Sequence, residues 1–311
     1  MKNHKKFTVV FRLALCLGLT LWIVCQNNST SAQTNDTKTK NFRQVVKKRL
    51  SKFKRVSIIN GKSIKTNVKL EEVCPIDTDL VAKRIFVEYG AVFIADDDVR
   101  IPTKCIFADE NEVQVFQNDS HSQTAVVGEI SITLQEPAMN ALLEAQQEAA
   151  KQNLQITPRG DALAAKRSYQ DTVELWNSRF YPALNYWVEK GRISREQAET
   201  AKQMAIHEQI ARVLEWETKG LFFSKDLSKS ILYSVAAPGA SQHIFMLALD
   251  VEQFANLSVR NILAKHGWFQ TVKSDFPHFT YLGVKESNLP QLGLKPFLIN
   301  RHKFWLTNHD F

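Results

Sequence analysis

Two short segments towards the C-terminal end of the chain carry the residues that most constrain its fold. One segment contains His243 and Asp250, and the other contains Asp275 and His278. Two imidazoles and one carboxylate are ligands that zinc takes in sites that leave a fourth position open. A fold that uses them must bring together residues that lie 35 positions apart (His243 and His278). The sequence therefore predicts a metal site of His243, Asp250 and His278, assembled from two separate segments.

The residues around these ligands favour strands. Residues 246–251 are largely apolar and end in a β-branched valine, which is typical of a buried strand that carries Asp250. Pro277 has a fixed φ and biases the residue before it towards extended geometry. We therefore predict a second strand over residues 276–281 that presents His278. Two neighbouring strands would hold the ligands with little freedom.

The order and spacing of these residues resemble those of a known family. The pattern Ser-x-His-x-x-Gly-x-Ala-x-Asp, followed by a carboxylate three residues before a histidine, is typical of zinc peptidases of bacterial cell walls. These are the VanY-like D-Ala-D-Ala carboxypeptidases and the related L-alanyl-D-glutamate peptidases of endolysins. The resemblance covers about residues 138–283. It implies that His243, Asp250 and His278 bind Zn²⁺ and that Asp275 is the catalytic base.

The last motif separates two branches of that family. The carboxypeptidase branch usually has Glu-Pro-Trp-His, whereas the endolysin branch has Asp-x-Pro-His-Phe. This chain has Asp275-Phe-Pro-His278-Phe and so is more similar to the endopeptidase branch. The resemblance implies a peptidase that cleaves peptidoglycan stem peptides, with D-Ala-D-Ala carboxypeptidase activity as the alternative.

Two positions depart from the family pattern. The family's carboxylate-binding arginine lies in a Ser-Gly-Tyr-Arg-Ser-Tyr-like segment, and this chain has Arg167-Ser168-Tyr169 without the preceding Ser-Gly-Tyr. The resemblance implies that Arg167 binds a substrate carboxylate. Met246 stands where the family has glycine. A methionine there either crowds the metal pocket or belongs to a repacked core. In the first case the chain could be a non-catalytic wall-binding protein that retains the fold.

Residues 1–32 have the composition of a cleaved signal peptide. Basic residues precede an apolar segment over residues 13–25, and Thr30-Ser-Ala32 supplies small residues for cleavage after position 32. A permanent N-terminal membrane anchor is the alternative, but the apolar segment is short for a membrane span and Arg12 interrupts its extension. We therefore expect an exported protein of the periplasm or the cell wall.

The cysteines are consistent with export. Cys16 and Cys25 lie within the predicted signal peptide, which leaves Cys74 and Cys105 as an even pair. Disulfides persist in oxidising compartments, so we expect a Cys74–Cys105 disulfide. Two free buried thiols are the alternative.

The net charge of +8 is concentrated at the N-terminal end of the chain. Residues 33–55 hold nine basic side chains and one acidic side chain. We predict a basic linker there, in which residues 38–55 either contact an anionic wall polymer or membrane surface or have no partner. Nucleic acid is not expected as a partner of an exported chain.

The remainder of the chain predicts two domains. A hydrophobic content of 44% supports packed cores. Residues 56–134 contain segments rich in β-branched and aromatic residues, over 84–94, 113–116 and 124–133, and predict a β-rich domain. Residues 136–311 predict a zinc peptidase-like domain, so the expected fold is α+β, with a small antiparallel sheet and helices that carry a zinc site. Helices are expected over 139–152, 162–179 and 194–218.

Overall fold

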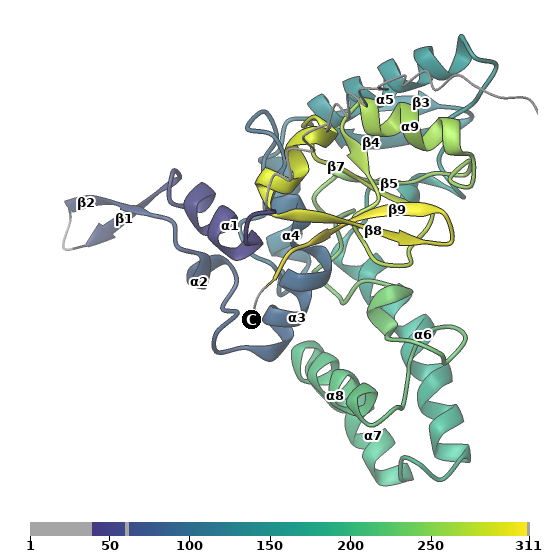
Figure 1. Ribbon diagram of the computed structural model, residues 1–311. Helices are drawn as coiled ribbons and strands as arrows, with labels where there is room; N and C mark the ends of the chain where they lie inside the picture. The colour runs from purple at the N-terminus through teal and green to yellow at the C-terminus, as the bar shows by residue number, and fades with distance from the viewer. Residues whose placement is uncertain (1–38, 60–61, 310–311) are drawn as a thin grey trace, which may run out of the picture. The chain divides into compact units, whose positions relative to one another are not determined.

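The computed structural model describes residues 39–59 and 62–309, which belong to one compact unit (Figure 1). The fold is α+β, as predicted, and combines helices with small antiparallel sheets. The predicted signal peptide lies outside the described residues. No helix in the described part of the chain has both the length and the apolar character of a membrane span. The helices are α1 (Phe42–Leu50), α2 (Leu70–Val73), α3 (Leu80–Tyr89), α4 (Glu110–Asn118), α5 (Glu136–Ala150), α6 (Tyr169–Glu189), α7 (Arg195–Gln203), α8 (Ile206–Thr218) and α9 (Leu257–Lys265), with 3-10 turns at Gly90–Ile94, Ala162–Ala164, Ile231–Tyr233 and Glu286–Leu292.

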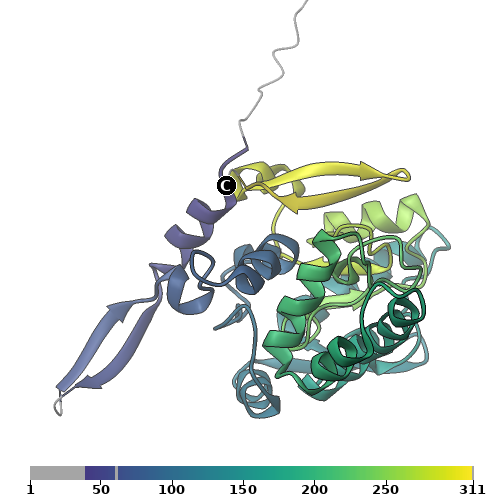
Figure 2. The same cartoon turned by 90° about the horizontal axis from the view of Figure 1, so that it is seen from below.

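The strands form three hairpins and one small sheet. In the sheet the order is β5-β7-β6, with antiparallel pairing throughout. The β1–β2 hairpin projects from the rest of the fold, and the β8–β9 hairpin lies on the opposite side of α1 (Figure 2). The strands are β1 (Lys54–Ile59), β2 (Lys62–Asn67), β3 (Ser122–Val127), β4 (Ile130–Gln135), β5 (Ala248–Asp250), β6 (Trp268–Phe269), β7 (His278–Tyr281), β8 (Leu294–Ile299) and β9 (His302–Thr307).

The β5-β7-β6 sheet contains both strands that were predicted to carry Asp250 and His278. Both are shorter than expected, because residues 242–246 form a turn before β5 and the chain bends at residues 276–277 before β7. All four residues of β7 are buried, as expected for the central strand of a covered sheet. The register pairs Asp250 with His278 directly across the two strands. This pairing brings two of the three predicted ligands together.

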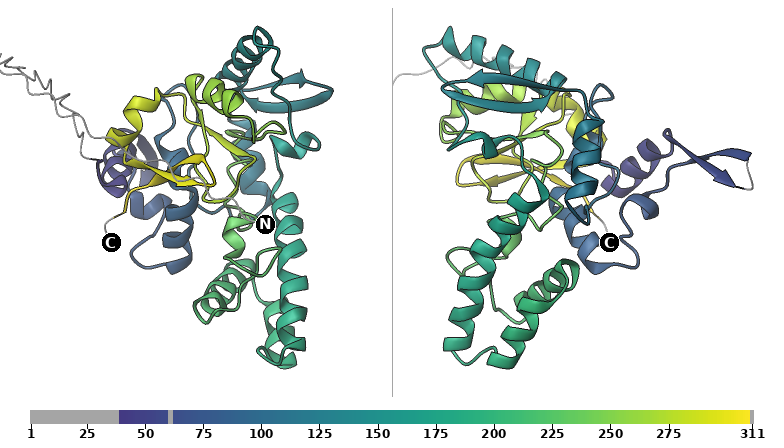
Figure 3. Two further views of the ribbon diagram at one scale, coloured as in Figure 1. Left: turned by 45° about the vertical axis from the view of Figure 1, so that its right-hand side comes forward. Right: turned by 180° about the vertical axis from the view of Figure 1, so that it is seen from behind.

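The helices of the C-terminal part follow the sequence with small shifts. α6 begins after Arg167 because Ser168 caps it, and Asp171 completes a capping box. The helical pattern over 194–218 is divided into α7 and α8 by a break before Ile206. α6, α7 and α8 lie together in an all-helical part of the fold, apart from the β3–β4 hairpin and α5 (Figure 3).

The description of residues 56–134 as β-rich is wrong for two of its three predicted strands. Residues 84–94 belong to α3 and the 3-10 turn that follows it, and residues 113–116 belong to α4. Both helices begin at an aspartate, Asp79 or Asp109, whose carboxylate accepts hydrogen bonds from the first-turn amides. These caps and a buried apolar face outweigh the β propensity of the valine and isoleucine side chains.

The third segment, 124–133, is β structure, but it forms two strands rather than one. The β3–β4 hairpin turns at Gly128, whose φ is +66°. α3 packs against α8 and β9, so residues 56–134 belong to the same compact unit as the C-terminal part of the chain.

The described part of the predicted basic linker contains helix α1, which packs one face against the core, and this corrects the prediction of a linker. α1 buries Phe42, Val46 and Leu50, which recur at the four-residue spacing of one helix face. Three of the four cations of α1 form ion pairs with acidic side chains, and so does Arg55 in β1, which lowers the charge that this segment presents to an anionic partner. The ion pairs are Arg43–Asp77, Lys47–Glu71, Arg49–Asp97 and Arg55–Glu72.

Cys74 and Cys105 form the predicted disulfide, with their Cα atoms 5.3 Å apart. It joins the end of α2 to the segment before α4, and the Cys105 amide also donates to the Val73 carbonyl. Because disulfides persist in oxidising compartments, this bond indicates a secreted or extracytoplasmic protein.

Candidate metal centre

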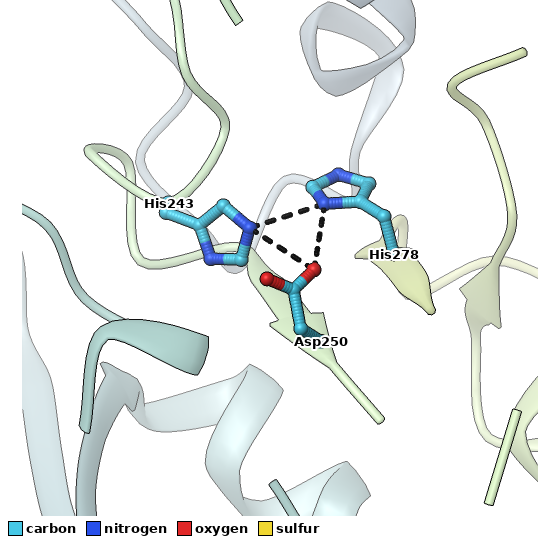
Figure 4. Close-up of side chains that lie close together, drawn as sticks. All are labelled: His243, Asp250 and His278. Atoms are coloured by element: carbon cyan, nitrogen blue, oxygen red, sulfur yellow. Dashed lines mark hydrogen bonds and ion pairs between the residues drawn. The ribbon is translucent and has the colours of Figure 1, made fainter. Parts of the chain in front are cut away.

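His243, Asp250 and His278 converge on one point of the fold (Figure 4). Asp250 ends β5, His278 begins β7, and His243 lies in the turn that leads into β5. The Nε2 atom of His243 lies 3.1 Å from the Nδ1 atom of His278. The Oδ1 atom of Asp250 lies 3.4 Å from the first nitrogen and 3.3 Å from the second. Three potential ligand atoms therefore form a nearly equilateral triangle.

This triangle has the size that a tetrahedral metal site requires. Zinc binds imidazole nitrogen and carboxylate oxygen at about 2.0–2.2 Å, and the edge of a tetrahedron is about 1.63 times the centre-to-corner distance, which gives ligand separations of about 3.3–3.6 Å. Two of the observed separations, 3.3 and 3.4 Å, lie within this range, and the third, 3.1 Å, lies just below it. The two histidines are almost fully buried, so their orientation is set by packing. The group could therefore hold a metal ion.

The Gln242 amide sets which nitrogen of His278 faces the triangle. Its Nε2 donates to the Tyr89 carbonyl at 2.9 Å, and a carbonyl can only accept. The other end of the amide, Oε1, therefore faces His278 Nε2 at 2.8 Å and also accepts from the Thr280 hydroxyl. Because Oε1 can only accept, His278 Nε2 must carry the proton. The lone pair of His278 is then on Nδ1, the atom that faces Asp250 and His243, as a metal ligand requires.

Replacement of Gln242 by leucine is expected to lower zinc affinity by about 10–100-fold, the cost typical of losing an outer partner of a histidine ligand. Competition with a chromophoric chelator would measure this change. Gln242→Glu is the matched control, because it keeps an acceptor for His278 Nε2 and should retain more affinity. Zinc affinity within about twofold of the wild type in a folded Gln242→Leu protein would show that this bond does not orient the ligand.

His243 is held in its neutral form by its surroundings. Burial, together with the nearby positive charge of Arg167, lowers the pKa of His243 to about 4. A neutral imidazole has the lone pair that a metal needs. The backbone carbonyl of His243 accepts hydrogen bonds from the backbone amides of Met246 and Arg167. The turn that contains His243 is thereby connected to the start of α6. Among the described residues, no hydrogen-bond partner reaches the Nδ1 atom of His243.

Met246 has a backbone conformation that favours glycine, the residue expected at this position from the family pattern. Its φ is +55°, in the left-handed region that glycine occupies without strain. The chain keeps this backbone conformation with a methionine, whose side chain is fully buried. The backbone carbonyl of Met246 accepts a hydrogen bond from the backbone amide of Gln135. This bond connects the turn that contains Met246 to the end of β4. Met246 does not line the cavity beside the metal ligands, so crowding of that cavity finds no support.

We expect Met246→Gly to lower stability by about 2 kcal/mol without raising any activity. Loss of a buried methionine costs about 2–5 kcal/mol, and relief of the left-handed strain returns about 1–2 kcal/mol. Denaturant unfolding would measure the change, and Met246→Leu, which keeps both volume and strain, is the control. A glycine variant with unchanged stability and higher peptide cleavage would instead support crowding.

Asp250 is oriented by Arg167 as well as by the histidines. Its Oδ2 atom accepts from Arg167 Nη2 at 2.8 Å, while Oδ1 faces His243 and His278. Burial disfavours the Asp250 carboxylate, but these neighbours outweigh it and hold its pKa well below the usual value. Arg167 also donates through Nε to the Leu163 carbonyl, so its guanidinium is engaged on two sides. The structure thus places Arg167 on the candidate ligand Asp250, and its predicted contact with a substrate carboxylate stays a prediction.

Asp275 lies on the same cavity as the three ligands. That cavity has a volume of about 370 Å³ and is lined by all four of the predicted metal and base residues. Burial raises the pKa of the Asp275 carboxyl to about 6. A carboxyl group with a pKa near neutrality suits a general base or acid. The positive φ of Ser274 (+62°) and the bond from the His278 amide to the Asp275 carbonyl shape the turn that presents it.

Two contributors to this centre had no signal in the sequence. Gln242 is one residue before a predicted ligand, but only the tertiary structure shows its contacts with Tyr89 and Thr280. Arg179, twelve residues after Arg167, also lines the cavity but belongs to no motif in the sequence.

Comparison of the sequence with protein-family models and with curated proteins gave no match. What the chain shows is therefore a buried His243–Asp250–His278 group that could bind a metal ion, beside a cavity that contains Asp275.

Proposed function

We propose that this protein is an exported zinc peptidase that cleaves peptide stems of peptidoglycan. One observation carries the proposal: three ligand atoms lie at tetrahedral spacing on a cavity that also contains a carboxyl group of raised pKa. The resemblance to VanY-like carboxypeptidases and L-alanyl-D-glutamate peptidases supplies the substrate class. The Cys74–Cys105 disulfide agrees with a periplasmic or cell-wall location.

The chemistry divides between a metal ion and the side chains around it. A zinc ion held by His243, Asp250 and His278 would supply a Lewis acid and bring the pKa of water to about 7. Asp275 accepts the proton of the attacking water and delivers it to the leaving amine. Arg167 holds the outer oxygen of Asp250, so that the inner oxygen stays directed at the histidines.

The Asp-x-Pro-His-Phe motif favours an endopeptidase that cleaves L-alanyl-D-glutamate, with D-Ala-D-Ala carboxypeptidase activity as the alternative. The digestion of purified muropeptides, followed by mass analysis of the products, distinguishes these two activities by the fragments released. We expect cleavage that depends on added or bound zinc. A zinc-loaded protein that leaves every muropeptide intact would contradict the peptidase proposal and favour a non-catalytic wall-binding protein.

A further inference from the structure

Three arginines line the cavity beside the metal ligands: Arg159, Arg167 and Arg179. Two of them are committed to neighbours. Arg167 pairs with Asp250 at 2.8 Å. Arg159 lies over the ring of Phe254, 5.2 Å from its centroid, and faces Glu252 at 3.9 Å. The positive charges of these two arginines are thus offset by acidic side chains of the protein itself.

Arg179 differs from the other two in its partners. Its Nε donates to the Ser234 hydroxyl at 3.1 Å, and its Nη1 donates to the Ser178 hydroxyl at 2.9 Å. Both partners are neutral, and no acidic side chain among the described residues forms an ion pair with Arg179. The side chain is partly buried, and α6 and Ser234 restrain it. A guanidinium has five donors in a planar fork that matches a carboxylate. Arg179 is therefore a positioned cation on the cavity wall with donors to spare.

We propose that Arg179 binds the carboxylate of the substrate residue that follows the scissile bond. The inference rests on the proposed function and specifies which substrates the same site accepts. Both substrate classes carry such a carboxylate. In a peptide that ends in D-Ala-D-Ala it is the C-terminal carboxylate, and in L-alanyl-D-glutamate it is the carboxylate that glutamate keeps outside the peptide chain. A cavity of about 370 Å³ has room for a ligand of this size.

This assignment changes the role expected for Arg167. The charge of Arg167 is already offset by the Asp250 carboxylate, so a substrate carboxylate at Arg167 would compete with a candidate metal ligand for the same guanidinium. Arg179 binds a carboxylate without that cost, because its present partners are hydroxyl groups. Arg167 then acts as a positioning residue, and Arg179 determines specificity.

Equilibrium binding of matched peptides tests the proposal. The protein would carry Asp275→Asn to suppress hydrolysis, and calorimetry would measure two probe pairs, each differing in one carboxylate: N-acetyl-D-Ala-D-Ala and its C-terminal amide, and N-acetyl-L-Ala-D-Glu γ-amide and its diamide. We expect the acid of at least one pair to bind about 10-fold or more tightly than its amide, the strength of a charged hydrogen-bonded contact. The pair that shows this preference identifies which carboxylate is bound.

Arg179→Gln should bring the acid-to-amide ratio to about 1, whereas Arg159→Gln, the matched control on the same cavity, should leave it unchanged. Arg179→Lys keeps the charge without the fork and should give an intermediate ratio, which provides a second reading if the glutamine variant does not fold. A ratio that persists in Arg179→Gln, or that is lost in Arg159→Gln, would overturn the inference, and so would equal binding of acid and amide by the parent protein.

Zinc content and chelator treatment separate this inference from the proposed function. Recognition by arginine needs no metal, so the preference for the acid should remain after zinc is removed. Absence of zinc from untreated protein would overturn the proposed function alone. Equal binding of acid and amide by a zinc-loaded protein would overturn the inference alone.

Discussion

The protein, purified without chelators, is expected to contain about one zinc ion per chain, and His278→Ala is expected to lose it. His278 supplies one corner of the ligand triangle, so its removal leaves two ligands on a site sized for three. Zinc affinity should fall by more than the roughly 10–100-fold that an outer-shell residue costs, and peptide cleavage should fall with it. Elemental analysis and chelator competition measure the first effect, and muropeptide digestion measures the second.

His302→Ala is the matched control for this prediction. His302 is also a buried histidine, but it lies in β9 and contacts Gln270 rather than the triangle. Its replacement should change stability without changing zinc content. If the wild-type protein contains no zinc, the three side chains form a hydrogen-bonded cluster with a proton on His243 Nε2, and the proposed function is wrong.

Asp275→Asn is expected to keep the fold and the zinc but to lose about 100-fold or more in rate, within the contribution usual for a general base. The change removes the proton acceptor from the cavity and leaves all three ligand side chains in place. It is nearly isosteric, so a loss of kcat without a loss of zinc would assign the effect to proton transfer. Steady-state kinetics together with metal analysis would measure both.

Asp275→Glu is the finer comparison. It restores a carboxylate one methylene longer, the residue found in the carboxypeptidase branch of the family that the chain resembles. Partial recovery of rate relative to Asp275→Asn would support the carboxylate as the base. Turnover of Asp275→Asn close to that of the wild type would place the base on another residue.

The local sequence was sufficient to predict the elements that carry the metal ligands. Residues 246–251 and 276–281 contain strands β5 and β7, because buried apolar runs and Pro277 favour extended backbone over short distances. Cys74 and Cys105 pair as predicted, since they were the two cysteines left outside the predicted signal peptide. The convergence of His243, Asp250 and His278 was predicted from ligand chemistry; the register of β5 with β7 pairs Asp250 with His278, and the turn before β5 adds His243.

Propensity was misleading where tertiary contacts outweighed it. Residues 84–94 are rich in β-branched and aromatic side chains, yet α3 and the turn after it bury them against α8 and β9. The basic stretch around α1 was expected to be a linker, because its charges are obvious in the sequence and its partners are not. Asp77, Glu71 and Asp97 lie 24 to 48 residues away and become partners only when the chain folds.

The sequence by itself determined which side chains can serve as ligands and base, because ligand and proton chemistry belong to the residue type and persist in any fold. It also determined the strands that carry two ligands, because extended geometry depends on near neighbours. Only the tertiary structure decided how those side chains are oriented. The tautomer of His278 depends on an amide whose other end is held by Tyr89, more than 150 residues away. Whether Arg167 or Arg179 is available to a substrate depends on which of them meets a carboxylate in the folded chain. Such choices depend on the packing of distant residues, which no local pattern records.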